Sequence, residues 1–486
     1  MDNTIELNNI RRETKPERQL EGDMRKLIYI FIVLGLVFGL SILGQRSDAR
    51  AQDATPDLTP MEELGKALFY DTDLSANGAQ SCAACHAPEA GFTGPDALVN
   101  AGGAVYQGAL PNHFGNRKPP ASAYAGDSPV LFFDEVDGGW FGGMFWDGRA
   151  SGWSLGDPLA EQAQGPYLNP LEQAIPTAPV LCVKVKQAEY AGLFEQVWGA
   201  GTLNCAKDVI GVYEKIGRSV AAYERSDEVN PFSSKFDLFW DNAKAAGKDV
   251  TKIRCGTGGM GGGGGGGMGG AMGCPGGGTS PYRWTNYLNL GFTDAELQGL
   301  AVFNDRAECS SCHTLEPGLA GYPLFTDFGY DNIGVPKNPD NPFYAMPPAW
   351  NPAGENWVDY GLGDFLKSAG YPAADYEPEM GKQKVPTLRN VDLRPSEDFV
   401  KAYGHNGYFK SLEDIVFFYH WRGMMDGGCM GGGGGMGGGG MGCEGMVDMF
   451  PPPEVDQNRT PLGMFPRPQV DNIVAFLETL SDGYIP

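Results

Sequence analysis

Two short motifs constrain this chain more than any other feature. "CAACH" spans residues 82–86 and "CSSCH" spans residues 309–313. In such a C-x-x-C-H motif the two thiols can bond covalently to the vinyl groups of one haem, and the adjacent histidine can bind its iron. A zinc site or a disulfide beside a chance histidine is the alternative, but two occurrences in a chain with 5 histidines favour haem. We therefore expect two covalently bound haem c groups, held by Cys82, Cys85 and His86 and by Cys309, Cys312 and His313.

Each motif follows a segment that carries the signals of a helix start. Thr59 can cap a helix that begins with Pro60, and Thr293 with Glu296 forms a capping box. Neither half of the chain shows a long alternating pattern of the kind that predicts strands. The sequence therefore predicts a mainly α fold with two cytochrome c-type domains and long loops rich in Gly and Pro.

Two tracts rich in Gly and Met divide the chain. We place the first domain at residues 54–245, a linker insertion at 246–285, and the second domain at 286–486 with a further insertion at 427–442. Ordering each glycine would cost at least ~1–2 kcal/mol with little apolar area to offset it, so we expect mobile, inert insertions. A docking surface for a partner and a Cu(I) site are the alternatives, because thioether groups suit both. The methionines concerned are Met260, Met268, Met272, Met430, Met436 and Met441.

The N-terminal 51 residues have the layout of an export signal. Arg25 and Lys26 precede an apolar run over residues 27–43, and Ala49 with Ala51 forms an A-x-A site. This predicts an N-terminal extension with a signal peptide that is cleaved after Ala51, or else an uncleaved membrane anchor. Both interpretations place the rest of the chain in the periplasm.

The remaining cysteines and the net charge agree with an exported protein that binds other proteins. Six cysteines outside the motifs fall into sequence-local pairs, and we expect disulfides, although fifteen pairings are formally possible and free thiols are an alternative. A net charge of −24 argues against nucleic acid and favours a basic or positively patched protein partner. The cysteines are Cys182, Cys205, Cys255, Cys274, Cys429 and Cys443.

A series of segments from Glu62 to Tyr484 resembles, in order, the bacterial dihaem cytochrome c peroxidase and MauG family. The segments include "SCAACHAPEAGF", "FWDGRA", "EQAQGPYLNPLE", "ECSSCHT", "NIGVP", "KVPTLRNV" and "GHNGYFKSLEDIVFFY". The resemblance implies a peroxide site at the first haem, with Gln162 and Glu172 as its distal Gln and catalytic Glu. It also implies that Trp146 relays electrons between the haems, whereas the residue pattern alone is more typical of core filling, and the two roles are compatible.

Tyr419 and His420 stand side by side on a predicted helix that begins at Ser411. Leu412, Ile415, Val416 and Tyr419 share one apolar face, and His420 lies at its margin. In the family the second haem takes its sixth ligand fourteen positions after the His of an "HNG" or "HDG" motif, as a Met in peroxidases and a Tyr in MauG. Counting from His405 leads to Tyr419, which would lower the reduction potential of the iron. His420, Met424 and Met425 are the alternatives.

Further positions follow from the resemblance. Asp147 and Arg149 would pair with each other or with a haem propionate, and His405 would support the site or bind a propionate. His113 is either a removable ligand of the first haem or a surface loop residue. An interdomain calcium is doubtful, because the Asn that usually helps to bind it aligns with Lys118, whose ammonium could replace the cation.

The function that we expect is the reduction of hydrogen peroxide at the first haem, with electrons relayed through the second haem from a cytochrome c-like redox protein. MauG-like oxidation of residues in a protein substrate is the first alternative. A non-enzymatic dihaem electron-transfer cytochrome is the second, and a peroxide sensor or copper-handling protein is the third. The family also implies a possible homodimer.

Overall fold

The computed structural model describes residues 57–256, 274–425 and 449–486. The predicted export signal, most of both Gly/Met tracts and the predicted Cys429–Cys443 pair lie outside these ranges. Within them, no helix is long and apolar enough to cross a membrane. The described residues between Asp57 and Pro486 form one compact unit.

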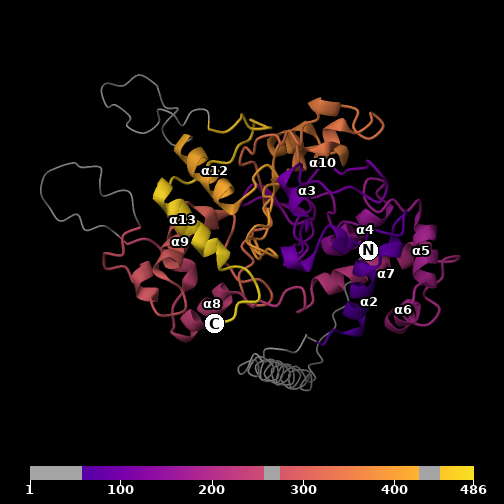
Figure 1. Cartoon of the computed structure of the whole chain (residues 1–486), viewed down its shortest axis with the longest axis horizontal. Coiled ribbons are helices and arrows are strands. Elements are labelled where there is room, and N and C mark those ends of the chain that lie inside the picture. Colours follow the sequence, from indigo (N-terminus) through magenta and orange to yellow (C-terminus); the bar gives the residue numbers. More distant parts are fainter. Residues whose placement is uncertain (1–56, 257–273, 426–448) are drawn as a thin grey trace, which may run out of the picture. The chain divides into compact units, whose positions relative to one another are not determined.

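The described chain is mainly helical, as the sequence predicted, with only two small two-stranded antiparallel sheets (Figure 1). The sheets pair β1 (Phe132–Asp134) with β2 (Gly139–Phe141), and β3 (Tyr330–Asp331) with β4 (Gln383–Lys384). The α-helices are α2 (Pro60–Tyr70), α3 (Ala97–Ala101), α4 (Pro158–Leu168), α5 (Ala178–Gln187), α6 (Ala191–Trp198), α7 (Val209–Glu224), α8 (Lys235–Ala245), α9 (Asp294–Asn304), α10 (Leu362–Ser368), α11 (Ala373–Tyr376), α12 (Leu412–Met424) and α13 (Val470–Glu478).

The predicted helix starts are confirmed. Thr59 accepts a hydrogen bond from the Glu62 amide at the start of α2, and the Glu62 carboxylate accepts one from the Thr59 amide. Thr293 and Glu296 form the same reciprocal pair at the start of α9. Such a capping box satisfies amide groups that the first helical turn leaves without partners. Each helix therefore begins at a fixed residue ahead of its C-x-x-C-H motif.

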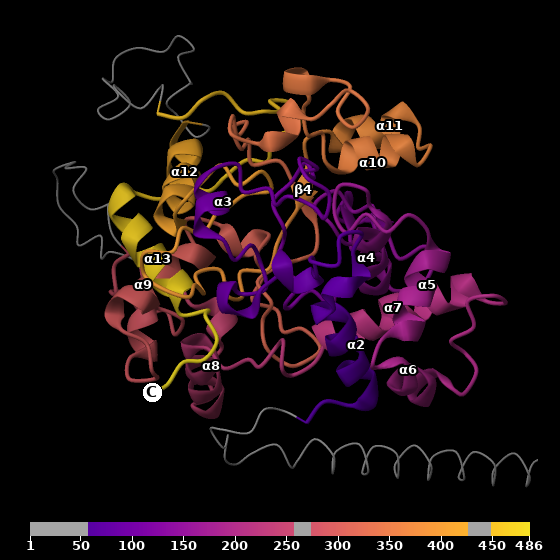
Figure 2. The same cartoon turned by 45° about the vertical axis from the view of Figure 1, so that its right-hand side comes forward.

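Two hydrophobic cores organise the fold. The N-terminal core takes most of its side chains from residues 64–229, where α7 packs against α2 and α4. The C-terminal core takes its side chains from residues 236–480, where α13 packs against α9 and α12. Figure 2 shows these two groups of helices apart from each other. Gly65 on α2 and Gly299 on α9 permit close helix packing, because a Cβ at either position would lie 1.9 Å from a backbone oxygen of the facing helix.

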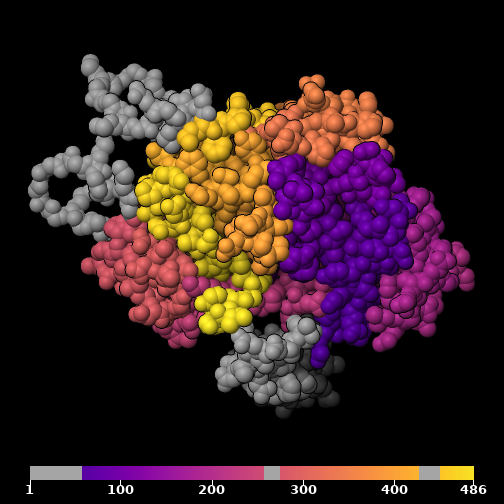
Figure 3. All heavy atoms as spheres, viewed as in Figure 1, coloured from indigo at the N-terminus to yellow at the C-terminus, as the bar shows by residue number. Residues whose placement is uncertain are grey.

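Lysine side chains join the parts that carry the two cores. The Lys401 ammonium donates to the carbonyl oxygens of Ala90, Asn390 and Leu393, at 3.0, 2.7 and 2.8 Å. Lys410 likewise donates to the carbonyl of Asn100 at 2.8 Å. Figure 3 shows the indigo and orange parts of the chain, which these lysines connect, directly against each other. The two parts are thus joined through polar groups.

A buried ion pair fixes α8 in the C-terminal core. Arg389 and Asp237 are both fully buried, and the Arg389 Nη1 lies 2.8 Å from Asp237 Oδ1 and 2.9 Å from Oδ2. Arg389 Nε also donates to the Pro323 carbonyl at 2.8 Å. Ser234 adds a hydrogen bond to the Asp237 carboxylate. Each charge therefore depends on its partner for the solvation that water would otherwise provide.

Disulfides close two segments. Cys182 pairs with Cys205, and Cys255 pairs with Cys274 at a Cα–Cα distance of 5.7 and 4.9 Å, respectively. Two of the three predicted sequence-local pairs are therefore confirmed. The four cysteines of the C-x-x-C-H motifs take part in no disulfide within the described residues.

Candidate active site

The first C-x-x-C-H motif lines a cavity of about 130 Å³. Cys82 begins a short 3-10 turn (Cys82–Ala84), and Cys82, Cys85 and His86 all face the cavity. The His86 Nδ1 lies 3.2 Å from the Phe92 carbonyl oxygen, which can only accept, so Nδ1 carries the proton and Nε2 keeps its lone pair. Burial also lowers the pKa of His86 to about 4, which keeps the ring neutral. A neutral imidazole held in this way is a ready metal ligand.

Gln162 and Glu172 line the same cavity. Gln162 comes from α4, whose N-terminus is capped by Asp157 with Pro158 in the first turn. After α4 the side chain of Asn169 accepts from the Leu171 amide, and its backbone carbonyl accepts from the Glu172 amide at 3.0 Å, so the chain turns back. This turn brings Glu172 beside the helix that carries Gln162.

The Glu172 carboxyl group has one neutral donor and one cation near it. Asn169 Nδ2 donates to Glu172 Oε1 at 2.8 Å. Burial raises the pKa of Glu172, and the Arg149 guanidinium and the Asn169 hydrogen bond only partly oppose this effect. The higher pKa brings the carboxyl closer to the point at which it both accepts and donates a proton near neutral pH.

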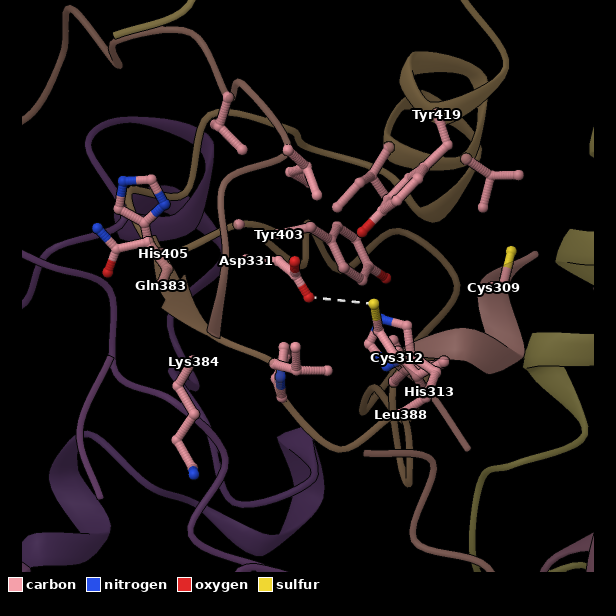
Figure 4. A pocket seen from close by; sticks show the side chains of 18 of the residues that line it. Cys309, Cys312, His313, Asp331, Gln383, Lys384, Leu388, Tyr403, His405 and Tyr419 are labelled. Carbon is pink, nitrogen blue, oxygen red and sulfur yellow. Dashed lines mark hydrogen bonds between the residues drawn. The ribbon is translucent and has the colours of Figure 1, made fainter. Parts of the chain in front are cut away.

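The second motif lines a larger cavity of about 250 Å³. Cys309, Cys312 and His313 lie along it, and His313 Nδ1 lies 2.9 Å from the Phe325 carbonyl oxygen. The same argument as for His86 leaves Nε2 of His313 free for a metal. Cys312 Sγ donates to Asp331 Oδ2 at 3.1 Å, as Figure 4 shows. In both cavities the thiols and the histidine of one motif therefore fit a covalently attached haem.

Tyr419 faces the second cavity from α12, and Figure 4 shows its hydroxyl pointing inward, across from His313. His420 is buried elsewhere: its Nδ1 lies 2.6 Å from the Phe465 carbonyl oxygen, and its ring packs against Phe417 and Phe465. Neither His420 nor Met424 nor Met425 lines this cavity. Burial raises the pKa of Tyr419, so a cation would be needed to stabilise its phenolate.

Trp146 lines both cavities. Its indole Nε1 donates to the Lys118 carbonyl at 2.8 Å, and its own carbonyl accepts from the Lys384 amide at 2.8 Å. Gly148, two residues later, has a φ of +76°, and a Cβ there would lie 2.5 Å from the Tyr330 hydroxyl. The turn of "FWDGRA" therefore requires a glycine at this position, and it holds Trp146 between the two cavities.

The other predicted positions lie around these cavities. Asp147 pairs with Arg149 at 2.9 Å, as predicted, and also with Arg117 at 2.5 Å. His405 is buried and lines the second cavity. His113 lines neither cavity; its Nδ1 lies 3.0 Å from the Pro111 carbonyl, in a partly exposed loop. Lys118 lines both cavities and donates to Thr93 Oγ1 and the Pro119 carbonyl, each at 3.1 Å.

Several cavity groups could not be found from the sequence. Glu224, the last residue of α7, faces the first cavity with a buried Oε2 that has no hydrogen-bond partner among the described residues, and burial raises its pKa to about 8. Gln173 lines the same cavity, and neither polar atom of its side chain has a partner in the described part of the chain. The one sequence signal was the four-residue spacing of Val220 and Glu224 on α7, which puts Glu224 on a buried helical face.

The comparisons with known proteins agree with this geometry. A profile described as "Di-haem cytochrome c peroxidase" matches residues 59–245. The methylamine utilization protein MauG of Paracoccus denitrificans is 30% identical over 372 residues, which cover 76% of each chain. The chain belongs to the di-haem cytochrome c peroxidase and MauG family. It is therefore an oxidoreductase of a family that uses two haems.

Two further members of this family are similar over most of their length. The cytochrome c551 peroxidase of Nitrosomonas europaea is 28% identical over 362 residues, which cover 74% of this chain and 73% of that one. The crystal structure of the diheme peroxidase BthA from Burkholderia thailandensis superimposes with a TM-score of 0.61 at 28% identity, over 90% of both chains. Relatives thus carry both the MauG and the peroxidase description.

Proposed function

We propose that the protein reduces hydrogen peroxide in the first cavity, with electrons that enter at the second haem from a cytochrome c-like redox protein. The observation that carries this proposal is the division of groups between the cavities. Gln162 and Glu172 line only the first cavity, Tyr419 lines only the second, and Trp146 lines both. One cavity thus has groups for proton transfer, and a single aromatic side chain connects it to the other.

The residues of the chain have distinct tasks in this proposal. Cys82, Cys85 and His86 would hold the first haem, which would supply an iron for peroxide binding and the redox equivalents. Glu172 moves a proton from one oxygen of the peroxide to the other, so that the departing oxygen leaves as water. Gln162 orients the peroxide through its amide. Asn169 positions the Glu172 carboxyl through the hydrogen bond at 2.8 Å.

Between the cavities, Trp146 would pass electrons, and Lys118 would supply positive charge. Lys118 is buried, and its ammonium lies beside Thr93 and Pro119. Burial lowers the pKa of Lys118 to about 8, so the side chain is still mostly charged at neutral pH. We propose that this ammonium takes the place of an interdomain calcium. The two disulfides support an exported, periplasmic location, because such bonds persist in oxidising compartments.

Tyr419 favours a second candidate, the MauG-like oxidation of residues in a protein substrate. Tyr419 faces the second cavity across from His313, and no sulfur from Met424 or Met425 lines that cavity. A phenolate ligand stabilises oxidised iron, whereas a thioether favours reduced iron. A haem with this ligand would accept electrons poorly from ordinary cytochromes and would suit a substrate that is itself oxidised.

The decisive assay adds hydrogen peroxide to the fully reduced holoprotein without oxygen. Peroxide reduction consumes two electrons and two protons and yields two waters. We therefore expect one peroxide to oxidise both haems of one chain, as measured by haem absorbance. Reduced haems that survive a peroxide excess would instead identify an electron carrier. Turnover with reduced cytochrome c then separates the peroxidase from the MauG-like oxidase, which should not oxidise that donor.

Tyr419→Phe tests the ligand of the second haem. The substitution removes one oxygen and keeps the ring, so the fold of α12 should persist. We expect the absorption and electron paramagnetic resonance signals of one haem to change, and its reduction potential to rise, because an anionic donor is lost. His420→Gln is the matched control and should leave both haem spectra as they were. If only His420→Gln changed the haem spectra, His420 and not Tyr419 would be assigned as the ligand of the second haem.

A further inference from the structure

His405 and Glu454 form a buried pair beside Trp146 that no step described above uses. The His405 Nε2 lies 4.0 Å from Glu454 Oε2, and both side chains line the second cavity. Neither of these two atoms has a hydrogen-bond partner within the described part of the chain. The His405 ring centroid is 6.4 Å from that of Trp146.

The pair is one end of a line of charged groups that reaches the first cavity. Arg149, which lines the first cavity near Glu172, pairs with Asp147 at 2.9 Å. Arg117 joins Asp147 to Asp359, at 2.5 and 2.6 Å. Asp359 Oδ2 lies 3.9 Å from His405 Nε2, and the Asp359 amide donates to Glu454 Oε1 at 3.2 Å. The line therefore runs between the same two cavities as Trp146.

This line fixes charge and does not conduct protons. A guanidinium keeps its proton throughout the pH range of proteins, so Arg117 and Arg149 cannot pass one on. The Asp359 carboxylate is held ionised, because the Arg117 guanidinium lowers its pKa against the effect of burial. The groups able to change charge are thus at the end of the line, at His405 and Glu454.

We propose that His405 and Glu454 hold one proton that is taken up when an electron arrives at the second haem and released when the electron leaves. The proposal rests on the proposed function, because peroxide reduction consumes two electrons and two protons. The electron comes from the redox partner and the proton from solvent. No bond other than that to the transferred proton forms or breaks.

The electrostatic surroundings suit this task. Burial and the Asp359 carboxylate raise the pKa of Glu454 to about 7, and burial lowers the pKa of His405 to about 4, so within the pair it is Glu454 that takes up or releases the proton near neutral pH. The Glu454 side chain is 4% exposed, and Pro452 and Asp456, two positions to either side of it in the sequence, are exposed. The charged or titratable groups that face the pair are Asp359, Arg117, Lys337 and Tyr344.

The sign of the effect follows from charge balance. An electron on the second haem adds negative charge near the pair and raises the proton affinity of Glu454 further. Below about pH 7 Glu454 is protonated in both redox states, and the potential should be independent of pH. Above that pH, each further pH unit should make reduction of the second haem tenfold less favourable, which lowers its potential by about 59 mV for one electron.

Spectroelectrochemical titration of the holoprotein at several pH values tests the proposal. In Glu454→Gln and in His405→Gln we expect the pH dependence to be lost or reduced, whereas Glu135→Gln, on the exposed β1–β2 turn, should keep it. Equal slopes in the wild type and Glu454→Gln, or no slope in the wild type, would overturn the proposal.

Infrared difference spectra of the wild type give a test that needs no stable variant. Reduction of the second haem above pH 7 should produce a carboxylic acid C=O band, and its absence would equally overturn the proposal. Peroxide turnover is measured on the same samples. If the protein turns over peroxide but the potential of the second haem does not depend on pH, proton uptake by His405 and Glu454 is rejected and the proposed function stands. If the potential depends on pH but peroxide is not turned over, the proposed function is rejected and proton uptake by the pair stands.

Discussion

Glu172→Gln is expected to lower peroxide turnover by about 100-fold to 10,000-fold, the usual effect of losing a positioned acid–base group. Glutamine has nearly the same shape and can still accept from Asn169 Nδ2, which donates to Glu172 at 2.8 Å. What it cannot do is take up and return a proton. Both haems should remain attached, and the steady-state rate with peroxide is the measurement.

The control for this substitution is Glu189→Gln. Glu189 is exposed in the same half of the chain and lines neither cavity, so its loss should leave turnover unchanged. Haem content and the stability of each variant are measured alongside turnover. A Glu172→Gln protein that keeps wild-type turnover would remove Glu172 from the mechanism and direct attention to Glu224, the other carboxyl group of this cavity.

Asp237→Ala is expected to reduce the free energy of unfolding by about 3–5 kcal/mol, because it leaves the buried Arg389 guanidinium without its counter-charge. Arg389 and Asp237 are both fully buried and lie 2.8 Å apart. Urea denaturation of the holoprotein, followed by circular dichroism, measures the change. The loss should be large because no water reaches the guanidinium to replace the carboxylate.

Asp241→Ala on the same helix is the matched control. Asp241 is exposed and accepts from the Tyr322 hydroxyl, so its replacement should cost about 1 kcal/mol or less. The double variant Asp237→Leu with Arg389→Met should regain much of the lost stability, since both charges are then absent. If Asp237→Ala were no worse than Asp241→Ala, water would have to enter the site and solvate the guanidinium.

Local features of the fold were predictable because neighbouring residues create them. The capping boxes at Thr59 and Thr293 need residues only three positions apart, and both are present in the structure. The two disulfides were also predicted, because their partners are near each other in the sequence, 23 and 19 positions apart. Long-range packing was not predictable in this way. A single sequence does not indicate that Arg117 meets Asp359, 242 positions later.

The candidate site divides in the same manner. The haem attachment residues could be predicted because each set lies within one five-residue C-x-x-C-H motif. The helical face of α12 distinguishes Tyr419 from its neighbour His420. The pairing of Asp147 with Arg149 was expected, whereas the closer contact of Asp147 with Arg117 was not. His405 and Glu454 come from loops that are separate in the sequence, and either residue alone reads as an ordinary polar group. Their relation appears only when the fold brings them to 4.0 Å.

The Cys255–Cys274 disulfide fixes the two residues that flank one segment, whatever the length of that segment. Its bond brings the two ends of residues 256–273 together, with the Cα atoms 4.9 Å apart, before any contact of the segment itself is considered. We therefore expect insertions or deletions between these cysteines to leave the end of α8 and the start of α9 in place. A reporter or affinity sequence inserted there should leave both C-x-x-C-H motifs in place.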